Sequence, residues 1–216
     1  MTTQGLRDLT RLKNMLWEHP LKYMVPAIHQ LDRTEIDALH SIQFSHQLLN
    51  VFLRKPDFHL DESLLIEAMS ALERCDRDHY NLQNGVGQNL LELSVECLLK
   101  NRSRASHGNQ LIAHLASRVA NINRIQSTSS WTNSGLTTVL MDAVIVADTG
   151  LAKVLMDNGA DPNAKGGRGH DCHYVNESTN KQIISHQEAY LDFKAMFLLH
   201  EHQQTLLSKR PTRPAL

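Results

Sequence analysis

The chain has 216 residues, a formal net charge of −1, and 41% hydrophobic residues. This length and composition fit one globular domain or a short stack of repeats and exclude a chain that is disordered throughout. The near-neutral charge argues against binding of nucleic acid through bulk charge.

Aromatic residues make up only 5% of the chain. A core of Leu, Ile, Val, Ala and Met is therefore expected, which favours stacked helices over a β-sandwich. The cysteines Cys75, Cys97 and Cys172 are odd in number and widely spaced, as is typical of reduced thiols. The charged N-terminal stretch does not resemble a secretory signal, and the longest apolar run, 139–147, is too short for a membrane span. We expect a cytoplasmic protein.

Apolar residues recur at helical spacing through the first half of the chain. Two helices are predicted within 6–31. One long helix is predicted over 34–54, with Thr34 and Asp37 as its capping pair. A further helix is predicted over 62–75.

Turns and helices alternate in the second half of the chain. Turns rich in glycine are predicted at 84–87 and 165–169, and polar loops at 101–109 and 124–134. The predicted helices cover 90–100, 110–118, a pair within 139–158, and 185–207, and the last eight residues, 209–216, are predicted to be a disordered tail.

The most informative segment is 143–164, AVIVADTGLAKVLMDNGADPNA. Gly159 suits the left-handed residue that ends a helix, and Asp161 and Asn163 supply side-chain hydrogen bonds for a tight turn. The segment resembles the second half of an ankyrin repeat, a unit with a turn and two antiparallel helices. The residues from Thr138 onward follow the opening pattern of that repeat.

Three departures and two weaker copies accompany this match. Leu136 stands where the repeat opens with glycine, Val139 where it has proline, and Met141 where it has histidine, so the shape of the turn stays open. A degenerate repeat covers 87–123 and requires insertions near 101–109 and after its last asparagine. A still weaker repeat ending lies at 78–81.

The resemblance implies an all-α fold, a short and irregular ankyrin-repeat stack flanked by capping helices. The expected parts are an N-terminal helical region at 1–83, repeats with inserted loops at 84–170, a C-terminal capping region at 171–208, and a tail at 209–216. The alternative is an unrelated helix pair that ends in an Asn/Gly turn.

Ankyrin repeats bind other proteins through their turn tips and the exposed side of each first helix, and the resemblance transfers these roles to matching positions. Trp131 is the sharpest candidate because tryptophan is enriched at binding hot spots, although it can instead fold back to seal its loop. Asp142 interrupts an apolar run and is expected to point outward. The full set of candidates is Trp131, Asn133, Ser134, Met141, Asp142 and Ile145, with Gln88, Glu92 and Glu96 from the earlier repeat and Arg168 and His170 from the following turn.

The resemblance implies a protein–protein recognition module or adaptor without catalysis and without a cofactor. Interrupted ankyrin-like chains also resemble effectors that intracellular bacteria inject into host cells, which would place this protein in the host cytoplasm. A resident cytosolic scaffold is equally compatible. A third hypothesis is that the stack serves self-association.

Metal or thiol chemistry at His170, Cys172 and His173 is the competing hypothesis. The two histidines have i, i+3 spacing, which suits zinc ligands, but no second ligand pair is evident. A thiol nucleophile needs a base within hydrogen-bond reach, and neighbours in sequence rarely meet that way. We expect neither a metal nor a catalytic residue, and a small Cys/His metal-binding or thiol enzyme remains the alternative.

Overall fold

The computed structural model describes residues 14, 20–41, 43–54, 62–74, 78–100, 108–126 and 136–208. Within these ranges the chain forms ten α-helices and no strand, which confirms the prediction of an all-helical protein. None of the helices in these ranges is both long and apolar enough to cross a bilayer.

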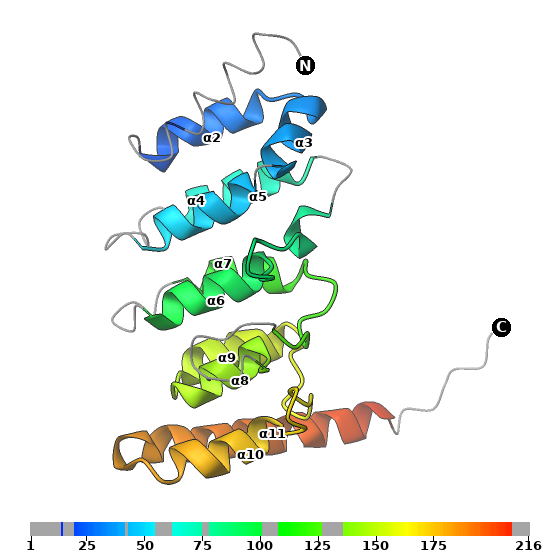
Figure 1. Ribbon diagram of the computed structural model, residues 1–216. Helices are drawn as coiled ribbons and strands as arrows, with labels where there is room; N and C mark the ends of the chain where they lie inside the picture. The colour runs from blue at the N-terminus through cyan, green and yellow to red at the C-terminus, as the bar shows by residue number, and fades with distance from the viewer. Residues whose placement is uncertain are drawn as a thin grey trace, which may run out of the picture.

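The helices lie in successive levels, one above another (Figure 1). Below α2 and α3 there are four helix pairs, and each pair contacts the next, as in helical repeat proteins. The levels are α2 (Leu21–His29) with α3 (Arg33–Ser41), α4 (Phe44–Phe52) with α5 (Glu62–Leu72), α6 (Leu90–Lys100) with α7 (Asn109–Ala116), α8 (Val139–Ile145) with α9 (Thr149–Asp157), and α10 (Cys172–Val175) with α11 (Gln187–Ser208).

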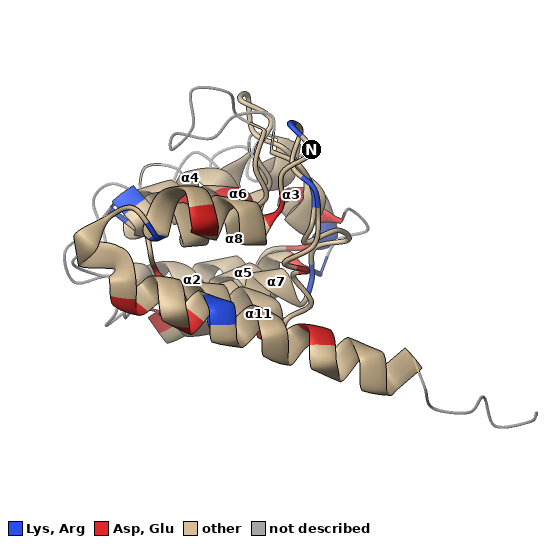
Figure 2. Cartoon of the chain, turned by 90° about the horizontal axis from the view of Figure 1, so that it is seen from below, with Lys and Arg blue, Asp and Glu red and all other residues tan. Residues whose placement is uncertain are grey.

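Seen along the stack, the helices form two layers (Figure 2). We call α3, α4, α6, α8 and α10 the front layer, and α2, α5, α7, α9 and α11 the back layer. Successive members of each layer contact one another, as do α4 with α5, α6 with α7, and α8 with α9. The π-helical turn η4 (Asn176–Asn180) continues α10 and contacts α8 and α11.

A single apolar core runs between the layers through all levels. Its buried phenylalanine side chains are Phe44 and Phe52 in α4 and Phe193 and Phe197 in α11, and Tyr80 of η2 (His79–Asn81) joins the core between them. The middle levels are filled by leucine, isoleucine and alanine side chains, which remove apolar surface from water while letting neighbouring helices approach closely.

Polar caps fix where the lower front-layer helices begin. At α6, the Asn89 side chain accepts from the Glu92 amide and the Glu92 side chain accepts from the Asn89 amide, both at 2.9 Å. Thr138 accepts from the third residue of α8, and Asp171 from the third residue of α10. The three helices therefore start in the same way, one level apart.

The turns before α6 and α10 share one hydrogen-bond pattern. The Asn84 amide donates to the Gln88 carbonyl at 2.8 Å, and the Gly166 amide donates to the His170 carbonyl at 2.8 Å. Each turn has a glycine with positive φ, 84° at Gly87 and 76° at Gly169, which other residues adopt only with strain. These two turn tips are structural equivalents, two levels apart.

Asparagine side chains link the levels on the other side of each pair. The side-chain oxygen of Asn81 accepts from the Ala120 amide at 3.0 Å, and that of Asn123 accepts from the Asp161 amide at 2.8 Å. The same contact thus recurs one level further along the stack.

The helix predicted over 34–54 is broken in two. The prediction was wrong because Gln43 adopts a left-handed backbone, with φ 56°, between the end of α3 and the start of α4. The predicted capping pair Thr34 and Asp37 was also wrong. Asp32 and Glu35 make the reciprocal hydrogen bonds at the start of α3, each at 2.9 Å.

Candidate binding surface

Two grooves open between helices of the front layer, one between α8 and α10 and one between α4 and α6. Below they are called the α8–α10 groove and the α4–α6 groove. Six of the residues predicted for binding line one or the other, so the front layer is where the sequence-based candidates gather.

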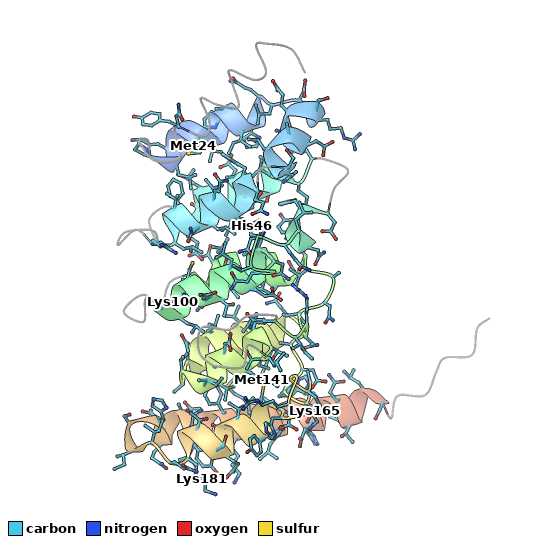
Figure 3. The ribbon with its side chains drawn as sticks, viewed as in Figure 1. Met24, His46, Lys100, Met141, Lys165 and Lys181 are labelled. Atoms are coloured by element: carbon cyan, nitrogen blue, oxygen red, sulfur yellow. The ribbon has the colours of Figure 1, made fainter. Side chains whose placement is uncertain are left out.

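The α8–α10 groove has a volume of about 480 Å³ and mixed apolar and polar walls. Met141 and Ile145 come from α8, and Figure 3 shows Met141 between α8 and the last level of the stack. Tyr174 and Val175 come from α10. The remaining lining residues are Leu136, Thr137, Gly166, Arg168, His170, Ser178 and Thr179.

Two glycines let the turn tip close one side of this groove. A Cβ atom on Gly166 would lie 2.6 Å from the Leu136 carbonyl oxygen, and one on Gly167 would lie 2.6 Å from the Leu136 Cβ. The Gly167 amide donates to that same carbonyl at 2.9 Å. Only glycine permits this approach. It brings the turn before α10 into contact with Leu136, which precedes α8.

Arg168 places one positive charge at the mouth of the α8–α10 groove. Lys165 is paired with Asp171, and hydrogen bonds from Lys165 and from the Tyr174 amide outweigh partial burial and lower the pKa of Asp171. Arg168 is exposed, and the described residues offer it no hydrogen bond or ion pair. The His170 ring stacks on Tyr174 with ring centroids 3.8 Å apart. An anionic group at this mouth would therefore meet an uncompensated guanidinium.

Asp142 does not point outward as predicted, because it is 2% exposed and accepts two hydrogen bonds inside the front layer. Gln126 donates its side-chain N–H at 2.9 Å, and Thr137 donates its hydroxyl at 2.8 Å. The Gln126 amide also donates to the Thr137 carbonyl at 2.8 Å. Asp142 thus holds together Gln126 and Thr137, which lie on either side of 127–136.

Glu92 is also buried, at 3% exposure, and was wrongly predicted to lie on the exposed helix face. Arg124 donates to both carboxylate oxygens, at 3.1 and 3.0 Å, and to the Gly87 carbonyl at 2.9 Å. Burial raises the pKa of Glu92, opposed by the Asn89 amide and by Arg124. Glu92 therefore anchors the start of the segment before α8.

The α4–α6 groove is larger, about 690 Å³, and its lining is mainly polar. Two of its side chains, the Gln88 side-chain amide and the Lys100 ammonium, both donate to Glu96, whereas the Asn50 side-chain oxygen is buried without a hydrogen-bond partner among the described residues. His46, labelled in Figure 3, bonds the Gln88 carbonyl at 3.1 Å. Because Gln88 and Glu96 already have partners, this groove is the weaker binding candidate.

The α8–α10 groove gathers four of the candidates, whereas the α4–α6 groove gathers two, Gln88 and Glu96. It brings together Met141, Ile145, Arg168 and His170. Trp131, Asn133 and Ser134 lie outside the described residues.

Sequence reasoning missed Tyr174, which forms one wall of the α8–α10 groove. Tyr174 is the third residue after its helix cap, Asp171, as Met141 is after Thr138. Alignment of the two caps would have found it.

The three residues of the competing metal or thiol hypothesis have different surroundings. Cys172 is buried in the core, and burial raises the pKa of its thiol, which disfavours the thiolate. His170 stacks on Tyr174 at the groove, whereas His173 lies 3.4 Å from Glu201 of α11. In the ranges that the structure describes, no three His, Cys, Asp or Glu side chains are arranged to hold a metal ion.

Comparison with known proteins adds no assignment to this geometry. No protein-family model matches the chain. No curated protein has a significantly similar sequence. The function is therefore argued from the grooves alone.

Proposed function

We propose that the protein is a recognition module that binds a segment of another protein in the α8–α10 groove. The observation that carries this proposal is the convergence of Met141, Ile145, Arg168 and His170 on one groove of the front layer. Concave surfaces with apolar walls and a few polar groups are the usual form of specific binding sites.

Ankyrin-like architecture is part of the proposal. Three features support it: the equivalent turn tips at Gly87 and Gly169, the capped front-layer helices, and the repeated amide contacts of Asn81 and Asn123. In such a stack the front layer and the turn tips are the binding face, and the α8–α10 groove lies between them.

The chemistry of the groove defines the partner. Met141, Ile145 and Val175 offer an apolar wall, whereas Arg168 at the mouth offers an uncompensated positive charge. A partner segment with an apolar side chain one or two residues from a carboxylate satisfies both groups. Charge-assisted pairing with arginine also favours carboxylates in bidentate geometry.

A peptide selection tests this chemistry directly. Peptides from a random library selected on the immobilised full chain are expected to share an acidic residue next to Leu, Ile, Met or Phe. Arg168→Glu is expected to weaken binding of the selected peptides about tenfold or more, because attraction becomes repulsion. The matched control is Lys153→Glu, an equally large charge reversal at an exposed side chain of α9.

Two results would contradict the proposal. One is a set of selected peptides without acidic residues, and the other is equal binding by the Arg168→Glu and Lys153→Glu variants. The analogy to host-targeting bacterial effectors adds no residue to this site and stays a prediction.

A further inference from the structure

Helix α11 is apolar on two opposite faces. One face is buried against the stack through Tyr190, Phe193 and Phe197. The other face is exposed and carries four leucines: Leu191 is 62% exposed, Leu198 57%, Leu199 58% and Leu206 54%. At 100° per residue these four positions and Ala195 fall on one side of the helix, opposite the buried aromatic side chains. We call them the leucine stripe.

The leucine stripe continues past the end of the stack. Residues 201–208 are all exposed, and Figures 1 and 2 show α11 projecting beyond the other helices. From Leu191 to Leu206 the stripe is about 22 Å long. A row of leucines this long on a helix marks an interaction surface, and its partner must be elongated because part of the stripe has no stack beside it.

We propose that α11 pairs in antiparallel orientation with α11 of a second copy of this chain. A two-fold interface requires one surface that is complementary to itself. The stripe meets this requirement when its midpoint lies on the two-fold axis: Leu191 then faces Leu206 of the second copy, and Leu198 faces Leu199. Every leucine of one stripe meets a leucine of the other.

Charge on the flank of the stripe supports this register. Lys194 and Glu201 lie on the same side of α11, between the stripe and the buried face, where Glu201 Oε1 is also 3.4 Å from His173 Nε2 of its own chain. In the antiparallel pair, Lys194 of each copy comes within about one helical turn of Glu201 of the other, so two ion pairs form at once. In Figure 2, which views the stack from below, α11 is mostly uncharged with few charged bands. The charges of Lys194 and Glu201 therefore favour the antiparallel arrangement of the two helices.

The inference does not rest on the proposed function, because the stripe contains no residue of the α8–α10 groove.

Sedimentation equilibrium of the full chain over a wide concentration range tests the inference, because it measures the mass of the species in solution. The expected result is a dimer, with twice the 24.4 kDa of one chain. Leu198→Glu is expected to raise the dimer dissociation constant about 100-fold or more, because two leucines leave the interface. Gln204→Glu, on the opposite side of the projecting turns, is the matched control and is expected to leave it unchanged.

A charge swap tests the flank. Lys194→Glu and Glu201→Lys are each expected to raise the dissociation constant about tenfold. The double variant with both changes is expected to restore dimerisation, which loss of folding would not do. Thermal unfolding by circular dichroism confirms that each variant folds.

Engineered cysteines test the orientation. Position 198 lies next to the two-fold axis, so Leu198→Cys is expected to form a disulfide between copies. Leu191→Cys is expected not to, because the two copies of this residue lie about 22 Å apart in the antiparallel pair. A chain that stays monomeric at all concentrations overturns the proposal. Efficient cross-linking at both positions overturns the antiparallel register.

Discussion

Asp142 and Glu92 are carboxylates enclosed in the front layer, and each is held by side chains from the segment before α8. An enclosed carboxylate without such partners destabilises the fold by several kcal/mol. The sequence could not predict these contacts. An aspartate within an apolar helix usually faces water, and no local pattern indicates that Gln126 and Thr137 meet across 127–136.

The Asp142 hydrogen bonds predict a specific stability loss. Asp142→Ala is expected to lower the free energy of unfolding by about 3 kcal/mol, because two enclosed donors lose their acceptor. Urea unfolding at neutral pH measures the change. The control is Asp157→Ala, whose side chain is 60% exposed, for which less than about 0.5 kcal/mol is expected. Equal losses for both variants would show that Asp142 does not hold the flanks of 127–136.

Arg124→Ala is expected to destabilise the protein in a pH-dependent way. It leaves Glu92 enclosed without its cation, which raises further a pKa that burial already places above the usual 4.5. The expected loss is about 3 kcal/mol near neutral pH. Because neutral Glu92 needs no cation, the loss should shrink as pH falls through the raised folded-state pKa. Urea titrations at several pH values measure this, and a loss independent of pH would contradict it.

His79 makes a second contribution to pH-dependent stability. It is 1% exposed, and its ring lies 4.8 Å from that of His40 and 3.9 Å from that of Tyr80. Burial, followed by repulsion from His40 and His114, lowers its pKa from 6.5 to about 3. Between these two pH values His79 binds a proton in the unfolded chain but stays neutral in the folded chain. The free energy of unfolding is therefore expected to fall as pH drops from 6.5 toward 3.

The test is His79→Phe, which keeps an aromatic ring between His40 and Tyr80. Between about pH 7 and pH 5 the wild type is expected to lose up to about 2 kcal/mol more than this variant. Urea midpoints across that range measure the difference. The exposed Gln204, which does not titrate, supplies the control for an added phenyl group, and Gln204→Phe is expected to keep the wild-type slope. Parallel slopes for all three chains would show that His79 does not titrate as inferred.

At the scale of the elements, two breaks depend on residues with positive φ that are neither glycine nor asparagine. Gln43 separates α3 from α4, and Ala147, with φ 62°, lies between α8 and α9. Neither residue signals a break, which is why one unbroken helix was predicted over 34–54. The helix at 90–100 was predicted at its true bounds, because regular apolar spacing and a preceding turn are local signals.

Ala147→Gly is expected to stabilise the protein by about 0.5–1 kcal/mol, because glycine adopts positive φ without strain. Ala152→Gly is the contrasting control. Ala152 lies inside α9 and is fully buried, so the same change is expected to destabilise by about 1 kcal/mol or more. Thermal unfolding ranks both variants against wild type. A destabilised Ala147→Gly chain would show that the methyl group contributes more than the strain.

At the scale of the whole molecule, the main contacts between the described helices join adjacent levels of the stack. Helices in the middle of such a stack pack against neighbours on both sides, so they should unfold locally less often than the helices at its ends. The sequence predicted the alternation of turns and helices between 84 and 158, whereas it missed the break at Gln43 and helix α10. It did not predict the leucine stripe on α11, since a helix apolar on two faces lacks the one-sided pattern of a surface helix.

Hydrogen exchange is expected to follow this order. Amides of α6 to α9 should exchange most slowly, whereas those of α2, α3 and residues 201–208 should exchange fastest. Mass spectrometry of peptides from the native chain at low protein concentration measures the protection. Uniform protection across all levels would indicate that the stack opens only as a whole.

The hydrogen bonds among Gln126, Thr137 and Asp142 make the front layer an attachment point for foreign sequences. Whatever lies between Gln126 and Thr137 starts and ends at two residues that are already bonded to each other. The closure entropy of a loop rises only slowly with its length. Lengthening the chain between Gln126 and Thr137 is therefore expected to add little closure entropy while Gln126, Thr137 and Asp142 keep their hydrogen bonds.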